Sequence, residues 1–566
     1  MDDVNFNFFL GAYASAVSRK LNDLRKNKII HRIRAADYTV WKSNPSGIVN
    51  RLGWINAPAE TLTQLSYIRS VLDPVIAEGY KNAVLLGMGG SSLAAYVFGK
   101  TCGTRKNYPA LSVLDTTDPA AICKITGNLN LKKTLFLVSS KSGTTLETVL
   151  LFHYFYNLTL KKTGTQAGRN FIIITDPGSP LEEIAQRMRL RHVFLADPSI
   201  GGRFSALSFP GIVPAALAGV NVEGLLKNAL AVAEKVKAPP SAGGLNSGSI
   251  GLGAALGTLA QKGRNKLTLL LPAAWKPFGG WLEQLLAEST GKEGRGILPI
   301  YDEPLQAANL YKNDRLFVIF YSKGKAASAK ISALVDAGHP VITIGINNRL
   351  HLGGHMFCWE MATAVAGHIL GINPFDQPDV ETSKILTRRL IDLYREKKEL
   401  PEEKPSLVTA ACRVYGYTKA ATPGGALRDF LEQATDYVCL HVYINQTPET
   451  DAALLKLRQA ISKKYRLAVT IGHGPRYLHS TGQLHKGDAG RGFFIQITSC
   501  DRRDIAIPDR PGHSHSTLTF GTLKTAQAIG DRRALIDLGR KTIRFHLEKD
   551  IIANINALAG YIQRKN

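Results

Sequence analysis

A polar loop between an apolar strand and an apolar helix constrains the fold of this chain more than any other stretch. The apolar run 134–138 is typical of a buried parallel strand, and an apolar helical pattern begins at 149. A strand–loop–helix junction directs backbone N–H groups and the positive end of a helix dipole at one point, which suits a phosphate. The loop adds hydroxyl groups from Ser140, Ser142, Thr144 and Thr145. The capping-box spacing from Thr144 to Glu147 predicts a helix start near Thr144. From this stretch alone, an ordinary polar turn of an α/β protein is an equal alternative.

A second junction of the same kind precedes it. The apolar run 81–87 predicts a parallel strand, and Gly89, Gly90 and Ser91 follow before a helical pattern. Glycines let a backbone approach an anion closely. Two such loops about 50 residues apart in one sheet suggest one ligand held from neighbouring strand ends.

The alternation of strands and helices predicts an α/β protein with two doubly wound parallel-sheet domains and a further C-terminal α/β domain. Further strands are expected near 110–114, 171–175 and 193–195, and the pattern restarts with strands near 266–271, 316–320 and 341–345. The predicted segments are a helical N-terminal segment 1–80, a first domain 81–237 with both loops, a second domain 238–400 and a C-terminal extension 401–566.

Composition indicates a soluble globular protein, with 45% hydrophobic and 20% charged residues. The net charge of +25 is spread along the chain, and aromatic residues do not interleave with it, so nucleic-acid binding is possible but not favoured. No segment predicts a membrane span. Six scattered cysteines without a Cys-x-x-Cys pair favour a reducing cytoplasm and argue against disulfides and a zinc site. His473, His479 and His485 are six residues apart, which favours a polar loop over a metal site.

Three residues are candidates for chemistry. Arg203 follows two glycines, and an arginine there can neutralise a phosphate or a developing oxyanion. Gln284 and Glu288 are four residues apart, so on a helix they share one face. A carboxylate beside apolar neighbours can act as a general base, although an ordinary solvent-facing glutamate is the commoner alternative.

Taken together, these motifs resemble glucose-6-phosphate isomerases. Five of them occur in the family's order between residues 81 and 390: Gly-Met-Gly-Gly-Ser-Ser, Ser-Lys-Ser-Gly-Thr-Thr, Gly-Gly-Arg-Phe-Ser, the glutamine–glutamate pair and the stretch 373–384. The set is most similar to the isomerase portion of bifunctional transaldolase/glucose-6-phosphate isomerase fusions. The resemblance implies two sugar-isomerase (SIS-type) domains, a homodimer, a sugar phosphate as substrate, and neither a cofactor nor a metal.

The resemblance also implies roles for particular residues. Phosphate binding would fall to the two loops, with Gly89, Gly90, Ser91, Ser140, Lys141, Ser142, Thr144 and Thr145. Gln284 and Gln377 match glutamines that contact the sugar. The catalytic positions would be Glu288 as the base that moves a proton between C2 and C1, Arg203 beside the enediolate, Lys384 near the ring oxygen, and His355 for ring opening.

Two positions depart from the family pattern. His355 matches the ring-opening histidine motif only partly, so His351 is a second candidate, and a histidine without a catalytic role is about equally expected. Gly143 stands where a phenylalanine is common, which predicts looser substrate selection.

The leading hypothesis is an isomerase that interconverts glucose 6-phosphate and fructose 6-phosphate through a cis-enediolate. One alternative also accepts mannose 6-phosphate. Another is a sugar-phosphate sensor without catalysis, although the presence of Glu288, Arg203 and Lys384 counts against it. A third is a nucleic-acid binder with a vestigial sugar site. The sequence assigns no role to residues 401–566.

Overall fold

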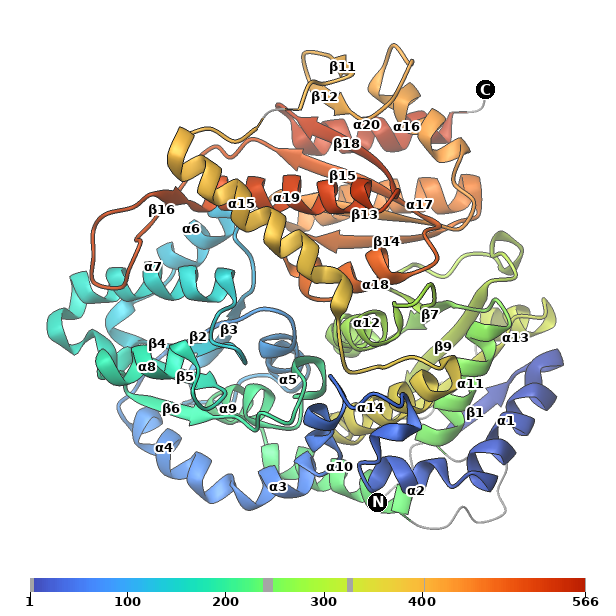
Figure 1. Ribbon diagram of the computed structural model, residues 1–566, viewed down its shortest axis with the longest axis horizontal. Helices are drawn as coiled ribbons and strands as arrows, with labels where there is room; N and C mark the ends of the chain where they lie inside the picture. Colours follow the sequence, from blue (N-terminus) through green and yellow to red (C-terminus); the bar gives the residue numbers. More distant parts are fainter. Residues whose placement is uncertain (1–4, 238–247, 323–328, 402, 565–566) are drawn as a thin grey trace. The chain divides into compact units, whose positions relative to one another are not determined.

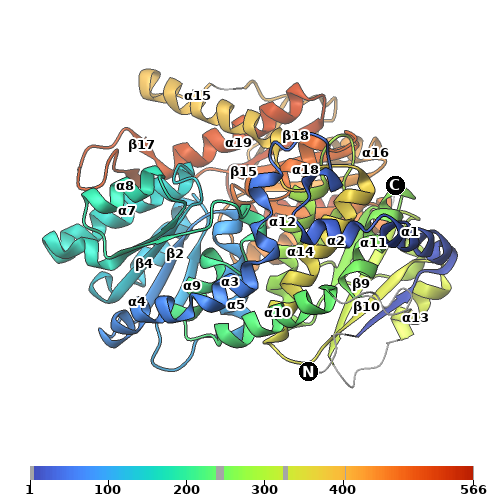
Figure 2. The ribbon, with the colours of Figure 1, turned by 60° about the horizontal axis from the view of Figure 1, so that its bottom comes forward.

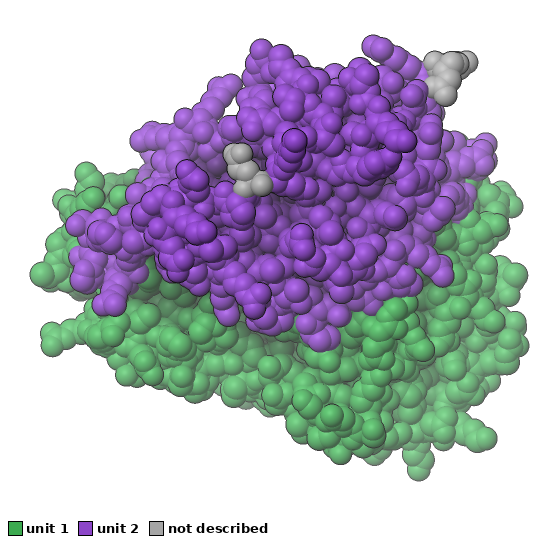
Figure 3. Space-filling model, turned by 45° about the horizontal axis from the view of Figure 1, so that its top comes forward, with its two compact units in different colours: residues 1–115, 129–308, 313–377 green, residues 116–128, 309–312, 378–566 purple. Residues whose placement is uncertain are grey.

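The computed structural model describes residues 5–237, 248–322, 329–401 and 403–564 (Figure 1). Two compact units are distinguished (Figure 3). Unit 1 contains residues 1–115, 129–308 and 313–377, and unit 2 contains residues 116–128, 309–312 and 378–566.

Unit 1 is built on two sheets, of which the first carries both phosphate-loop candidates. Its five strands are all parallel and lie in the order β3-β2-β4-β5-β6. Their bounds are β2 (Asn82–Leu86), β3 (Ala110–Leu114), β4 (Thr134–Ser139), β5 (Phe171–Thr175) and β6 (His192–Leu195). Strand β4 is buried along its whole length, as its uninterrupted apolar run requires.

The chain order changes direction between β2 and β4 in this sheet. Strand β3 lies on one side of β2, and the chain then crosses to add β4 on the other side. Figures 1 and 2 show α7 (Leu146–Thr163) and α8 (Pro180–Arg187) on one face, and α4 (Leu65–Ala77) and α9 (Phe209–Leu217) on the other. A crevice at the carboxyl ends of such neighbouring strands is where open α/β sheets bind ligands. The two loops follow β2 and β4, so they lie at this point.

The second sheet of unit 1 includes a strand that the sequence analysis did not predict. Its order is β1-β10-β9-β7-β8, with bounds β1 (Phe6–Phe9), β7 (Lys266–Leu270), β8 (Leu298–Tyr301), β9 (Arg315–Ser322) and β10 (Val341–Ile346). Strand β1 is the antiparallel edge strand, beside β10. The expectation of a wholly helical segment 1–80 is therefore wrong at its start. Four residues of edge strand are too short for their alternation to stand out in a sequence.

One continuous apolar core joins the two sheets and the helices of unit 1. The other helices of this unit are α1 (Ala14–Lys26), α2 (Ile29–Arg34), α3 (Ala57–Thr63), α5 (Leu93–Cys102), α10 (Val222–Lys237), α11 (Ser249–Gln261), α12 (Lys276–Thr290), α13 (Ala329–Asp336) and α14 (His351–Leu370). The predicted boundary between 237 and 238 adjoins residues 238–247, which lie outside the described residues. The four-segment division stays a prediction.

Unit 2 contains a six-stranded mixed sheet in the order β11-β12-β18-β15-β13-β14. Its strands are β11 (Leu407–Val408), β12 (Cys412–Tyr415), β13 (Tyr437–Tyr443), β14 (Ala468–His473), β15 (Gly492–Ser499) and β18 (Lys541–Leu547), and a separate pair is formed by β16 (Ala506–Ile507) and β17 (Leu518–Thr519). The helices are α6 (Pro119–Gly127), α15 (Glu381–Lys397), α16 (Pro423–Glu432), α17 (Pro448–Tyr465), α18 (Gly482–Gly487), α19 (Phe520–Asp537) and α20 (Ile551–Gln563).

The predicted α/β class is confirmed in both units. Strands β13, β14 and β15 alternate with helices α17 and α19, which gives the C-terminal extension the α/β character that the sequence analysis expected. Within the part of the chain that the structure describes, no helix has the length and apolar character needed to cross a membrane.

The loop Gly89–Ser91 lies directly against the turn Gly202–Phe204 that carries Arg203. This close approach predicts that only glycine fits at position 90. A Cβ atom at Gly90 would lie 2.1 Å from the Gly202 carbonyl oxygen, whereas one at Gly202 would meet nothing within 4 Å. We expect Gly90→Ala to lower the free energy of unfolding by about 1–3 kcal/mol. Gly202→Ala is the matched control and should change it by less than about 0.5 kcal/mol. Denaturant unfolding of both variants tests this, and equal effects would contradict the close approach.

Candidate active site

The loop after β4 forms a small network of hydroxyl groups. Ser140 Oγ lies 2.9 Å from Thr145 Oγ1, and Ser142 Oγ lies 2.9 Å from Thr144 Oγ1. Ser142 and Thr144 are exposed, whereas Ser140 is buried. Four hydroxyls therefore surround the start of α7, where backbone N–H groups and the helix dipole favour an anion.

The predicted capping box is wrong. Helix α7 begins at Leu146, two residues later than expected, and Thr145 precedes it without a side-chain capping hydrogen bond. The physical reason is that Thr145 and Thr144 direct their hydroxyls to other loop residues, Ser140 and Ser142. The helix start is thus not capped by the N-cap side chain, which suits the binding of an external anion.

Lys141 and Gly143 of this loop have structural partners of their own. Lys141 Nζ lies 2.6 Å from Asp176 Oδ2 and donates to the Pro198 carbonyl (2.9 Å), so the structure directs its charge to the neighbouring strand end. Gly143 has φ of +67°, and a Cβ there would lie 2.9 Å from the Ser179 Cβ. Glycine replaces the family's common phenylalanine at position 143, where the backbone is left-handed and leaves no space for a side chain.

The loop after β2 is a short 3₁₀ turn, Gly89–Ser91, followed by α5. The Ser92 hydroxyl donates to the Gly89 carbonyl (3.1 Å) and Ser205 Oγ donates to the Gly90 carbonyl (3.3 Å). Gly89 and Gly90 are buried, while Ser91 is partly exposed. These contacts fix the first loop to the turn Gly202–Phe204, which carries Arg203.

Arg203 makes more polar contacts than any other described residue of the candidate site. Its side chain is 3% exposed, and burial lowers the pKa of its guanidinium while Glu288 opposes that shift. Nε donates to Ser289 Oγ (2.8 Å), and Nη2 donates to the carbonyls of Pro374 (2.7 Å) and Asp376 (2.8 Å). Nη1 donates to Gln377 Oε1 (3.0 Å) and lies 3.1 Å from Glu288 Oε1.

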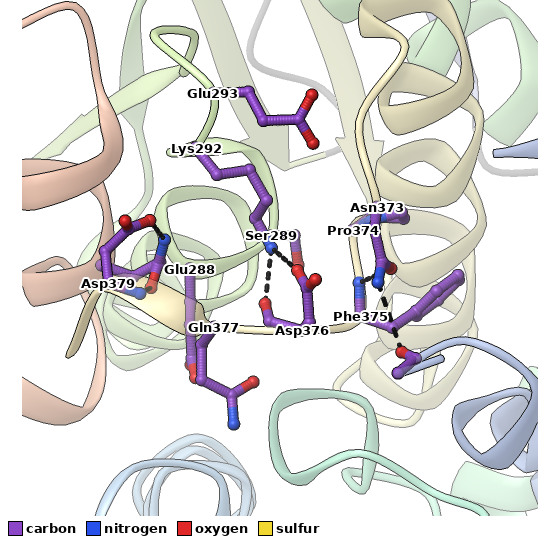
Figure 4. A network of polar contacts seen from close by, with 12 residues as sticks. Glu288, Ser289, Lys292, Glu293, Asn373, Pro374, Phe375, Asp376, Gln377 and Asp379 are labelled. Atoms are coloured by element: carbon purple, nitrogen blue, oxygen red, sulfur yellow. Dashed lines mark hydrogen bonds and ion pairs between the residues drawn. The ribbon is translucent and has the colours of Figure 1, made fainter. Parts of the chain in front are cut away.

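The predicted shared face of Gln284 and Glu288 is confirmed. Both lie on α12, and Gln284 Nε2 donates to Glu288 Oε2 (3.0 Å). Apolar residues of α12 are buried on either side, including Leu285 and Leu286. One carboxylate oxygen of Glu288 thus faces a buried guanidinium and the other faces an amide. Glu288 is therefore not an ordinary solvent-facing glutamate, which was the alternative interpretation of the sequence. Figure 4 shows Glu288 and Ser289 on the helix opposite the segment that carries Asp376 and Gln377.

Lys292 is a site residue that the sequence analysis missed. Its side chain is 2% exposed, and Nζ lies 2.7 Å from Asp376 Oδ1 and also donates to the Asp376 carbonyl (Figure 4). Burial, with a smaller contribution from Arg203, lowers the pKa of Lys292 to about 8, and Asp376 opposes the shift. The one sequence signal for Lys292 was its position four residues after Glu288, which on a helix would place both side chains on one face. Lys292 lies just past the end of α12, however, so this helical spacing does not apply to it.

The structure brings some predicted residues to Arg203 and not others. Gln377 contacts it directly. His355 instead lies among the rings of Trp275, Phe278 and Phe320, and burial lowers its pKa to about 3. Phe278 is ten residues before Glu288 on α12, or roughly 15 Å along the helix at 1.5 Å per residue. His355 is therefore an apolar-core histidine away from the carboxylate.

The remaining histidines and Lys384 have different surroundings. His351 begins α14. Lys384 lies on α15 in unit 2, where it is exposed and pairs with Glu381 (3.3 Å). The expected polar loop of histidines is wrong, because His473 ends β14, His479 lies in a 3₁₀ turn and His485 is fully buried in α18. All six cysteines are free thiols.

Residues 74–292 match the family model described as Phosphoglucose isomerase. The matched segment contains both phosphate-loop candidates, Arg203, Gln284, Glu288 and Lys292, whereas Gln377 and Lys384 follow it.

Curated proteins and solved structures are also similar to this chain. A glucose-6-phosphate isomerase from Rubrobacter xylanophilus is 29% identical over 445 residues, covering 68% of this chain and 98% of the relative. A probable glucose-6-phosphate isomerase from Methanococcus maripaludis is 29% identical, covering 54% of this chain and 78% of the relative. A hypothetical protein from Thermus thermophilus has a TM-score of 0.57 at 25% identity, covering 68% of this chain and 99% of that one. A glucose-6-phosphate isomerase from Chlamydia trachomatis shares the fold, with a TM-score of 0.57 at 18% identity, covering 71% and 90%.

The lowered pKa of Lys292 predicts a pH-dependent stability. Because its folded pKa of about 8 lies below its ordinary value of 10.5, the unfolded chain binds the proton more tightly in this window. The free energy of unfolding of the wild type should therefore rise with pH relative to Lys292→Gln, by at most about 3 kcal/mol between pH 8 and 10.5. Denaturant unfolding across this range measures the difference.

Lys276→Gln is the control for this measurement. Lys276 is the first residue of α12, the helix that ends just before Lys292, but it is 55% exposed, so the difference between Lys276→Gln and the wild type should not show that rise. A difference between wild type and Lys292→Gln that stays constant from about pH 7 to 10.5 would contradict a lowered pKa at this site.

Proposed function

We propose that the protein is an aldose–ketose isomerase that interconverts glucose 6-phosphate and fructose 6-phosphate. The observation that carries the proposal is the Glu288 carboxylate, held 3.1 Å from the buried Arg203 guanidinium. The turn that carries Arg203 also contacts one of two loops suited to a phosphate. The family match over 74–292 and the named glucose-6-phosphate isomerases among its relatives support the same activity.

The reaction assigns a task to each group. The two loops hold the phosphate dianion of an aldose 6-phosphate. Glu288 removes the proton from C2, which leaves a cis-enediolate, and then returns the proton at C1. Arg203 supplies the positive charge that the enediolate oxygen needs. One carboxylate suffices for both transfers, so the reaction as written requires no metal or redox cofactor.

The contacts of Glu288 are compatible with this mechanism. In the structure, Oε1 faces Arg203 and Oε2 accepts a hydrogen bond from Gln284. Each carboxylate oxygen has a second lone pair, so one of them can accept the C2 proton while these contacts hold the carboxylate in place. Gln377 contacts the same guanidinium and is the proposed partner of a sugar hydroxyl.

Other expected features belong to the proposal on the strength of the resemblance. These are Lys384 near the ring oxygen, a homodimer, a cytoplasmic location and a closer relation to the isomerase portion of the transaldolase fusions. The ring-opening group is left unassigned, because His355 lies in an apolar cage. Acceptance of mannose 6-phosphate stays an alternative within the same reaction class.

The decisive variant is Glu288→Gln. We expect at least a ~100-fold loss of kcat with nearly unchanged binding of fructose 6-phosphate, because the amide keeps the shape but cannot accept the proton. A coupled assay and calorimetric binding measure the two quantities. Glu293→Gln is the control, since Glu293 is exposed and pairs with Lys42. Unchanged kcat would remove Glu288 as the base, and binding without turnover in the wild type would favour the sensor.

The phosphate loop is tested separately by Ser142→Ala combined with Thr145→Ala. Loss of two hydroxyl donors should raise the KM for fructose 6-phosphate by about tenfold or more, at about 1 kcal/mol for each hydrogen bond, and leave kcat less affected. Ser70→Ala is the control, because the Ser70 hydroxyl only bonds a carbonyl on the exposed face of α4. An unchanged KM would place the phosphate elsewhere.

A further inference from the structure

A cluster of three metal-ligating side chains lies in unit 2, apart from the residues used above. Cys500 directly follows β15, His546 is the residue before the last one of β18, and Glu548 directly follows β18. These strands are parallel neighbours, with Ser499 paired to Leu547, and Figure 1 shows them side by side. The three residues therefore meet at the carboxyl ends of two adjacent strands, where α/β sheets place ligands.

The distances within the cluster suit one cation. Cys500 Sγ lies 3.3 Å from His546 Nε2, and a ligand atom from each of the three residues lies within 4.8 Å of the other two. Zinc–sulfur and zinc–nitrogen bonds of about 2.3 and 2.0–2.1 Å at a tetrahedral angle separate the two ligand atoms by about 3.5 Å. The observed separation is close to this value.

His546 is already oriented as a ligand. Its other ring nitrogen, Nδ1, lies 2.9 Å from Thr498 Oγ1, and Thr498 is its register partner on β15. A hydrogen bond at one ring nitrogen fixes the ring plane and selects the nitrogen that faces a metal.

Charges of both signs surround the cluster. Glu548 and Asp501 lie near the Cys500 thiol, as do Arg413 and Lys524. Arg413 Nε lies 2.5 Å from Glu548 Oε1, so this carboxylate already has one positively charged partner. A divalent cation would stabilise both the thiolate and the carboxylate.

We propose that Cys500, His546 and Glu548 bind a zinc-class divalent cation, with a further position open to water or a small ligand. Cys500 is exposed, so an ion can reach the site from solvent. Three protein ligands with one open position are typical of reactive rather than purely structural zinc sites. The expectation from cysteine spacing that the chain lacks a zinc site does not apply here, because the ligands come from two strands 46 residues apart.

A second cluster, Cys439 with His441 and His485, is a weaker candidate. All three residues are buried, and His441 Nε2 and His485 Nδ1 are hydrogen-bonded to each other at 3.1 Å. The Lys486 ammonium is buried beside them, 2.6 Å from Asp531, and it contributes to the lowered pKa of both histidines after burial itself. A fixed positive charge in a closed interior disfavours a cation.

The test uses the full-length protein and Co²⁺ as a spectroscopic probe. We expect the wild type to bind one Co²⁺ with a thiolate-to-cobalt charge-transfer band, and Zn²⁺ to displace it. Cys500→Ser should abolish the band, and His546→Gln or Glu548→Gln should weaken binding by at least about tenfold. Circular dichroism and unfolding midpoints establish that each variant is folded.

Matched controls come from residues of the same type outside the cluster. Cys123→Ser and His515→Gln should keep both the band and the affinity, since Cys123 is only partly exposed on α6 and His515 pairs with Asp509. The proposal is overturned if the wild type gives no charge-transfer band, if folded Cys500→Ser keeps it, or if Cys123→Ser removes it.

Discussion

The buried guanidinium of Arg203 is the interaction on which the proposed site depends. An arginine removed from water requires nearly complete hydrogen bonding and a compensating charge. Glu288 supplies the charge, and the remaining donors bond to Ser289, Gln377 and the carbonyls of Pro374 and Asp376. The need to satisfy this buried guanidinium therefore fixes three elements relative to one another: Glu288 on α12, the segment 374–377, and the turn Gly202–Phe204 that carries Arg203. Removal of the Arg203 guanidinium would leave the half-buried Glu288 carboxylate without a positively charged partner.

This network explains why Lys292 belongs to the site without touching Glu288. The Asp376 carbonyl accepts from both Arg203 and Lys292, so the two cations hold one peptide group between them. Two positive charges close together repel each other, which contributes to the lowered pKa of Lys292, and the Asp376 carboxylate offsets part of that cost. The local positive charge at this site is thus set by Arg203, Lys292 and Asp376 together, and the family resemblance pointed only to Arg203.

Sequence alone predicts the parts of this protein that depend on local periodicity. Buried parallel strands such as β4 and the helical pairing of Gln284 with Glu288 follow from spacing, and the structure confirms both. The capping box failed because Thr144 had a competing partner in Ser142, which spacing does not show. The ring-opening role of His355 stays a prediction, because its partial motif match and its apolar surroundings point in different directions. A motif fixes a residue's place in the chain, whereas its function depends on which rings and charges surround it after folding.

Strand ends account for what sequence analysis overlooked in unit 2. A parallel sheet brings the carboxyl ends of distant segments to one edge, so residues with no sequence spacing in common become neighbours. The loops after β2 and β4 were recognisable because each carries its own glycines and hydroxyls. Cys500 and His546 carry no such local signal, and only the pairing of Thr498 with His546 across β15 and β18 brings them within 3.3 Å. A ligand set divided between two strands is therefore invisible to motif spacing, even though the same kind of sheet geometry makes the phosphate loops of unit 1 easy to predict.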